Sequence, residues 1–79
     1  MTSQIDLFAP KAERQQFVDW LYLEIHAAGA IHEDEIRWRM HAAGYVDELV
    51  NGGLERALRV LRDLYLVRRV DAHVWEPCP

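Results

Sequence analysis

Histidine is the residue type in this chain whose placement could serve catalysis or metal binding. The sequence holds four histidines and a single cysteine, Cys78. Two of the histidines open identical tetrapeptides, HAAG, at residues 26–29 and 41–44. The repeat could supply two halves of one site, because imidazole is a common metal ligand. It could also mark two helix ends, where glycine adopts the left-handed conformation that stops a helix.

The helix-end interpretation accounts for more of the sequence than a divided active site. Histidine in a last helical turn favours the negative end of the helix dipole when it is protonated. The other two histidines, His32 and His73, stand in separate segments, and a zinc site built from the four with Cys78 has no supporting spacing. The chain contains no HExxH, no CxxC and no glycine-rich phosphate loop, and its sole serine is Ser3. We therefore expect no enzyme, no metal and no cofactor.

The acidic run Glu33–Glu35 has two explanations, a carboxylate metal cluster and the first turn of a helix. If His32 is the N-cap, the run fills the turn where the helix dipole favours negative charge. Ile31 and Ile36 then stand at the spacing of a hydrophobic staple, one before the cap and one at the fourth helical position. The sequence therefore predicts that a helix begins here.

Arginines form the other group that could do chemistry. The chain carries a net charge of −4, which argues against a simple polyanion-binding protein. Residues 54–70 nevertheless hold five arginines against two acidic residues, and the whole local positive excess lies in this window. These residues are Arg56, Arg59, Arg62, Arg68 and Arg69. Arginine can grip phosphate oxygens or guanine edges with two hydrogen bonds, so this window is the candidate anion-binding segment.

Length and composition limit what can position these residues. A chain of 79 residues with 51% hydrophobic and 28% charged residues is typical of one small globular domain. No apolar run approaches the roughly 18 residues of a membrane span, so we expect no membrane partner. The start shows no basic segment followed by an apolar one, and the single cysteine cannot form an intramolecular disulfide. We expect a cytoplasmic protein.

The chain divides into an arm at residues 1–10, one domain at residues 11–77 and a tail at residues 78–79. Pro10 is expected to open the first helix, from about Lys11 to Ala28. Its core stripe consists of Phe17, Leu21, Ile25 and Ala28. The segment has more large apolar side chains than one buried stripe requires. The additional ones are Phe8 in the arm and Trp20 and Leu23 on the flank of the helix. Either the arm covers the flank or a second copy does.

The remaining elements are predicted from changes in the spacing of apolar residues along the chain. The second helix buries Ile36 and Met40 and turns Trp38 away from that face. A connection at residues 44–53 is expected to contain a helical turn near residues 47–50. The third helix runs from about Gly53 to Tyr65, with a shared core face. That face is formed by Leu54, Leu58, Leu61 and Tyr65, with Ala57 and Leu64 beside it. Two short strands, residues 66–70 and 73–76, turn at Asp71-Ala72.

This arrangement resembles the winged-helix, or winged helix-turn-helix, superfamily. The stretch GGLERALRVLRDLYLVRRVDAHVWEP, residues 52–77, is similar to the third helix and wing of these domains, and AIHEDEIRWRM is placed like their second helix. The resemblance covers roughly residues 12–77 and is a pattern of apolar positions. It implies a mainly α-helical protein with a small β-hairpin, in which a three-helix core is followed by a C-terminal wing.

The resemblance also implies a function. Winged-helix proteins commonly insert the third helix into the DNA major groove and lay a basic wing along the backbone. Here Arg56 and Arg59 would approach bases or nearby phosphates, and Arg62, Arg68 and Arg69 would meet phosphates. The expected protein is therefore a small transcriptional regulator that binds double-stranded DNA. A homodimer formed through the arm and first helix would present two third helices to a palindromic site.

Two features depart from the DNA-binding pattern. The connection before the third helix exceeds the usual turn of three or four residues, and that helix opens with two glycines and Glu55, whose charge repels phosphates. The alternative is a protein-binding winged helix, acting as an adaptor or as a small inhibitor of a larger nucleic-acid-handling complex. Pairing of the arginines with Glu55, Asp63, Asp71 and Glu76 would favour this alternative, and Glu55–Arg59 and Arg59–Asp63 both have the i,i+4 spacing for it.

Overall fold

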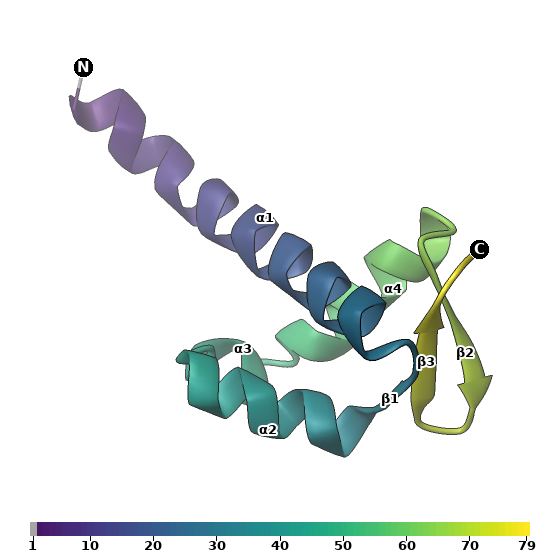
Figure 1. Cartoon of the computed structure of the whole chain (residues 1–79). Coiled ribbons are helices and arrows are strands. Elements are labelled where there is room, and N and C mark those ends of the chain that lie inside the picture. The colour runs from purple at the N-terminus through teal and green to yellow at the C-terminus, as the bar shows by residue number, and fades with distance from the viewer. Residues whose placement is uncertain (1) are drawn as a thin grey trace.

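Four helices and a three-stranded sheet make up the part of the chain that the structure describes. The computed structural model describes the backbone of residues 2–79 and the side chains of residues 15–79 (Figure 1). In chain order the elements are α1 (Thr2–Ala28), β1 (Ile31–His32), α2 (Glu33–Ala43), α3 (Val46–Val50), α4 (Gly53–Asp63), β2 (Val67–Asp71) and β3 (Val74–Pro77). The expectation of a mainly helical protein with a small antiparallel β element near its C-terminus is confirmed.

Helix α1 begins at Thr2, so the start expected near Lys11 was placed too late. The segment before Lys11 contains no glycine and only Pro10 as a helix breaker. The packing expected of the arm, including that of Phe8, falls on side chains outside the described part. The helix ends at Ala28 as expected, where Gly29 takes φ +82° and donates its N–H to the Ile25 carbonyl at 3.0 Å.

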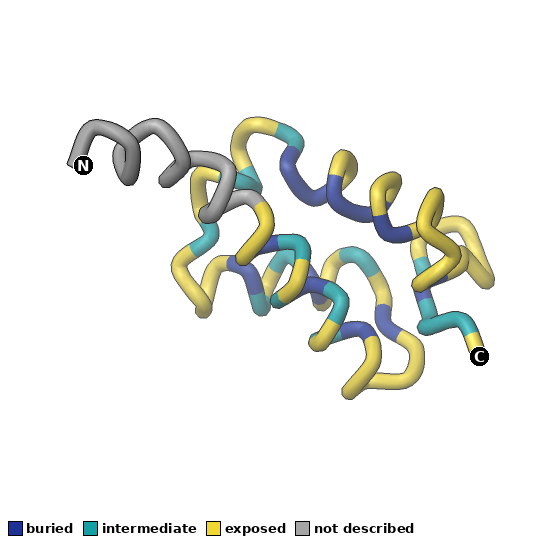
Figure 2. Tube along the Cα trace, turned by 90° about the horizontal axis from the view of Figure 1, so that it is seen from above, coloured by how far each residue is buried: buried dark blue, intermediate teal, exposed yellow. Residues whose placement is uncertain are grey.

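The core lies where the helices meet the sheet. Its buried hydrophobic residues come from α1, α2, α4 and all three strands: Phe17, Leu21, Ile25, Ile31, Ile36, Met40, Leu54, Ala57, Leu58, Leu61, Val67 and Trp75. Buried stretches alternate with exposed ones along the helices, as amphipathic helices require (Figure 2). The expected stripe of α1 is confirmed except at Ala28, which is exposed beside the helix end.

The start of α2 is built as the sequence predicts. His32 is the N-cap, with φ −78° and ψ 146°, and its Nδ1 accepts the backbone N–H of Asp34 at 3.0 Å. A nitrogen that accepts this bond carries no proton, so the cap uses the neutral imidazole. Ile31 and Ile36 are both buried, which confirms the hydrophobic staple.

The two HAAG segments are helix ends, but they stop their helices differently. Gly29 makes a single bond back to the preceding turn. After α2, Gly44 takes φ +89° and donates to the His41 carbonyl at 3.2 Å, while Tyr45 donates to the Met40 carbonyl at 2.8 Å. That pair of bonds is a Schellman motif. It also turns Tyr45 inward, where its ring lies 5.0 Å from that of Phe17.

Helix α4 ends earlier than expected. The chain leaves the helix after Asp63, and Tyr65 takes the left-handed φ of +59°. Tyr65 donates to the Arg62 carbonyl and Leu66 to the Leu61 carbonyl, both at 2.9 Å, so this end is another Schellman motif with tyrosine at the glycine position. The expected core placement of Tyr65 and Leu64 was wrong, because the reversal turns both side chains outward, where they are 83% and 60% exposed.

The sheet contains one strand that the sequence does not reveal. β1 pairs antiparallel with β3, and β3 with β2, giving the order β1-β3-β2. The register places Ile31 opposite Trp75, so both side chains enter the core. The hairpin turns at residues 72–73, one residue later than expected, because Val70 is an extra residue between the paired Arg69 and Asp71.

Candidate nucleic-acid interface and helical groove

The five arginines expected to bind DNA are all exposed, three on α4 and two on β2. On α4 the buried residues Leu54, Ala57, Leu58 and Leu61 occupy the face toward the core. Arg56 and Arg59 therefore point away from the core, as 100° per residue requires. Strand β2 follows α4 after three residues, so both groups belong to neighbouring elements near the C-terminus.

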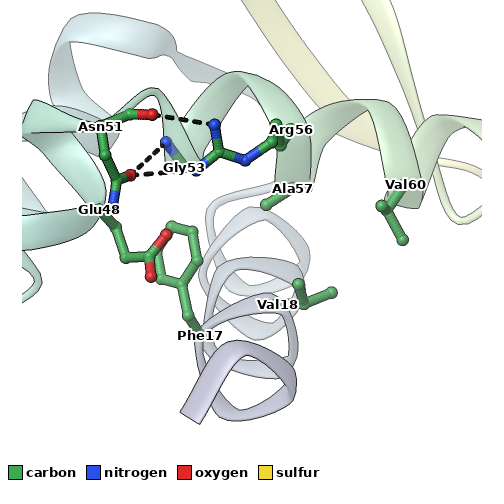
Figure 3. Close-up of a pocket in the computed structure, with 8 residues that line it drawn as sticks. All are labelled: Phe17, Val18, Glu48, Asn51, Gly53, Arg56, Ala57 and Val60. Atoms are coloured by element: carbon green, nitrogen blue, oxygen red, sulfur yellow. Dashed lines mark hydrogen bonds between the residues drawn. The ribbon is translucent and has the colours of Figure 1, made fainter. Parts of the chain in front are cut away.

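Arg56 is held by the loop before its own helix. Its guanidinium donates to the Asn51 carbonyl at 2.9 Å and to Asn51 Oδ1 at 3.2 Å. The same Oδ1 accepts the N–H of Gly53 at 3.0 Å and so satisfies a donor at the start of α4 (Figure 3). Arg56 has no carboxylate partner among the described side chains, but its geometry is already fixed.

Two of the five arginines are paired with carboxylates of the described side chains. Arg68 Nε donates to Glu76 Oε1 at 2.6 Å across the hairpin, where the register places the two residues opposite each other. Arg62 Nη2 lies 3.5 Å from Asp63 Oδ1, a longer contact between sequence neighbours. Both pairs are solvent-accessible, so they lower the local positive charge while adding little to stability.

The pairs expected within α4 do not form. Glu55 accepts from Arg37 of α2 at 3.2 Å rather than from Arg59. Arg37 is already held by Glu33 at 3.4 Å and by Asp34 at 3.2 Å, and it brings Glu55 into that cluster. Among the described side chains, Arg59 and Arg69 have no carboxylate oxygen within 4 Å. They are thus the arginines with guanidinium groups open to a ligand.

A second polar cluster joins the start of α2 to the β2–β3 hairpin, and sequence reasoning did not find it. Glu33, whose side chain is 13% exposed, accepts the indole N–H of Trp75 at 2.8 Å. Its backbone N–H donates to the carbonyl of His73 at 2.7 Å, and His73 Nδ1 lies 3.6 Å from Glu33 Oε1. The partners are 40 or more positions apart in the sequence, where periodicity gives no signal.

Arg39, in contrast to Arg59, has carboxylate partners among the described side chains. It lies on α2, where its Nε donates to Glu35 at 3.1 Å and its Nη1 to Glu24 at 3.4 Å. The hydrogen bond to Glu35 is the main reason that the pKa of Arg39 is raised above its ordinary value. Arg39 is therefore a surface arginine with both carboxylate partners in place.

The side chains expected at a dimer interface differ in how far they are buried within the domain. Trp20 is half-buried within its own domain, with its ring 4.9 Å from that of Tyr45 and 6.0 Å from that of Phe17. Leu23 is 62% exposed. Phe8 lies outside the described side chains. Much of the aromatic surplus of α1 is therefore used inside the domain.

A groove lies between α1, α3 and α4, and sequence reasoning did not predict it. Its volume is about 420 Å³. Apolar walls are formed by Phe17 and Val18 of α1 and by Ala57 and Val60 of α4, while Glu48 of α3 lies at one end (Figure 3). A smaller hollow of about 180 Å³ shares Phe17 and Glu48 with it.

Two further observations bear on what the protein does. Among the described residues, no helix combines the length and hydropathy that crossing a membrane requires. Comparisons of the chain with protein-family models, with curated proteins and with solved structures found no match.

Proposed function

We propose that the protein is a winged-helix DNA-binding protein, a transcriptional regulator that contacts double-stranded DNA with α4 and the β2–β3 wing. The order of the elements supports this assignment. Helices α1, α2 and α4 share one core, and the hairpin begins three residues after the last of them. That is the arrangement on which the resemblance to winged-helix domains rests.

The observation that carries the proposal is the direction of Glu55. In the sequence Glu55 stands where it can neutralise Arg59 and repel phosphates. In the structure Arg37 of α2 binds its carboxylate at 3.2 Å instead. Arg59 on α4 and Arg69 on the wing keep their guanidinium groups free of described carboxylates. A binding surface for phosphate requires such uncompensated arginines, since each contact depends on releasing counterions from the DNA.

The connection before α4, although longer than the usual turn, is ordered. It contains the short helix α3, and Asn51 after it caps the start of α4. The connection is thus an ordered spacer that fixes where α4 begins. Arg56, held by Asn51, is presented in one geometry, which lowers the entropy lost when it binds a base or phosphate.

The test is DNA affinity measured as a function of salt. Arg59→Gln combined with Arg69→Gln removes two proposed phosphate contacts, and each contact contributes about one unit to the slope of log K against log salt. Fluorescence anisotropy with a labelled mixture of duplexes should give a slope that is about two units shallower.

Arg39→Gln is the control, since it removes one positive charge from an arginine that is already paired with carboxylates. It should leave the slope unchanged. Equal slopes for the wild type and the double variant, or an equal loss in the Arg39 variant, would show that the affinity reflects overall charge. Absence of duplex binding by the wild type at low salt would refute DNA binding itself.

The second candidate function is protein binding by a winged helix, as an adaptor or inhibitor. One observation favours it: Leu64, Tyr65 and Leu66 are consecutive and exposed at the α4–β2 junction. Exposed apolar residues that adjoin one another are characteristic of interaction sites. Under this function Leu64→Ser should abolish binding of the partner, whereas the Arg59 and Arg69 changes should leave it intact.

A further inference from the structure

The groove between α1, α3 and α4 has the two parts of an amphipathic binding site. One part is apolar, formed by Val18, Ala57 and Val60. The other is the carboxylate of Glu48, which extends from α3 toward Phe17 at the end of the groove (Figure 3). A volume of about 420 Å³ lies within the range of small-molecule sites, roughly 300–1,000 Å³.

The position of Glu48 depends on the absence of a side chain at residue 53. A β-carbon built on Gly53 would overlap the Glu48 carboxylate and lie 2.9 Å from both Cβ and Cδ of Glu48. The carboxylate thus lies against the first turn of α4, where the helix dipole favours negative charge. Glycine at this position leaves the space that Glu48 occupies.

Among residues 15–79, no side chain forms an ion pair or hydrogen bond with the Glu48 carboxylate. The nearest cation along the groove, Arg56, directs its guanidinium to Asn51. Asp47 lines the smaller hollow, which shares Phe17 and Glu48 with the groove.

We propose that this groove binds a small alkylammonium ligand, a primary amine on a short aliphatic chain. The ammonium group would donate to Glu48, and the chain would lie along Val18, Ala57 and Val60. Glu48 disfavours an acidic ligand, and a neutral apolar ligand would contact the apolar walls but leave the carboxylate unpaired. A charge-assisted hydrogen bond is roughly twice as strong as a neutral one, so the ammonium head determines selectivity.

The probe is hexylammonium, titrated into the full-length protein without DNA while the backbone amide signals of Ala57 and Val60 are followed by NMR. Three ligands separate the contributions of charge and chain: 1-hexanol, hexanoate and ethylammonium. Hexylammonium should bind at least ten-fold more tightly than 1-hexanol or ethylammonium, and hexanoate should not bind. Equal affinity for hexylammonium and ethylammonium would reduce the effect to attraction of cations by an acidic protein and would overturn the proposal.

Two variants test the contacts. Glu48→Gln keeps the shape of the side chain and should weaken hexylammonium binding at least ten-fold while leaving 1-hexanol unchanged. Val60→Ser, at a position that is 45% exposed, should weaken both ligands. Glu35→Gln on α2 is the control carboxylate and should have no effect. Undiminished hexylammonium binding by folded Glu48→Gln would refute the site. Because no measurement involves DNA, the result is independent of the proposed DNA binding.

Discussion

Gly53→Ala tests whether α3 and α4 fit together as the structure shows. Gly53 is the first residue of α4 and does not need a left-handed conformation, so intrinsic propensity alone favours alanine. Replacing glycine by alanine at a compatible position stabilises a protein by about 0.4–1 kcal/mol. Against this, the new β-carbon would lie 2.9 Å from Cβ and Cδ of Glu48 and would overlap its carboxylate.

The collision should outweigh the gain in propensity. The Glu48 Cβ is fixed to the backbone of α3, so rotation of the side chain alone cannot relieve its contact with the new methyl group. Overpacking of this kind costs about 1–3 kcal/mol. Subtracting the propensity gain leaves a net loss of about 1 kcal/mol, which lowers the melting temperature of a domain this size by about 4–8 °C.

A double-mutant cycle with Glu48→Gly isolates the collision, measured by urea unfolding followed by circular dichroism. In the Glu48→Gly background the whole side chain, including Cβ, is gone, so Gly53→Ala should cost at least about 1 kcal/mol less than in the wild type. Gly52→Ala is the matched control. Gly52 has φ +80° and its added β-carbon would approach nothing closer than 3.5 Å, so its cost should be backbone strain that is unchanged by Glu48→Gly. If Gly53→Ala stabilised the otherwise wild-type protein, the reasoning would be refuted.

Two further predictions concern the ends of helices. Tyr65→Gly should raise the free energy of unfolding by about 0.5–1 kcal/mol, because left-handed strain of about 1–2 kcal/mol is relieved and part of it is offset by the greater flexibility of glycine. Urea denaturation measures this, and a loss of stability would mean that the exposed ring makes a stabilising contact. His32→Ala should cost about 1 kcal/mol by removing the α2 cap, whereas His32→Asp should retain it. Equal melting temperatures for the two variants would contradict a capping role for the His32 side chain.

The parts of the fold that sequence could predict are those governed by local rules. Gly29 and Gly44 stop helices because only glycine enters the left-handed region without a penalty, and His32 caps α2 because its neighbours fit a helix start. Tyr65 escaped prediction for the same reason, since it occupies a left-handed position without being glycine. The buried face of α4 was predictable from the helical spacing of its apolar residues, whereas the residue at which the helix ends was not.

The parts that escaped prediction depend on contacts between distant residues. β1 has only two residues, too few to show an alternating pattern, and it is a strand because β3 lies beside it. The pairing of Glu55 with Arg37 was invisible because local spacing favoured Arg59. The arginines themselves were found from composition, but which of them are free depends on where α2 lies.

The hydrogen bonds and ion pairs of Glu33 and Arg37 couple three parts of the fold. Glu33 binds Trp75 and His73 of the β2–β3 hairpin, and Arg37 binds both Glu33 and Glu55 of α4. The hairpin, the first turn of α2 and the start of α4 are therefore joined through one residue pair. Sub-global opening of the hairpin must break the bonds of Glu33 to Trp75 and His73, so the amide protons of β3 and of the first turn of α2 should exchange with solvent in a single cooperative event.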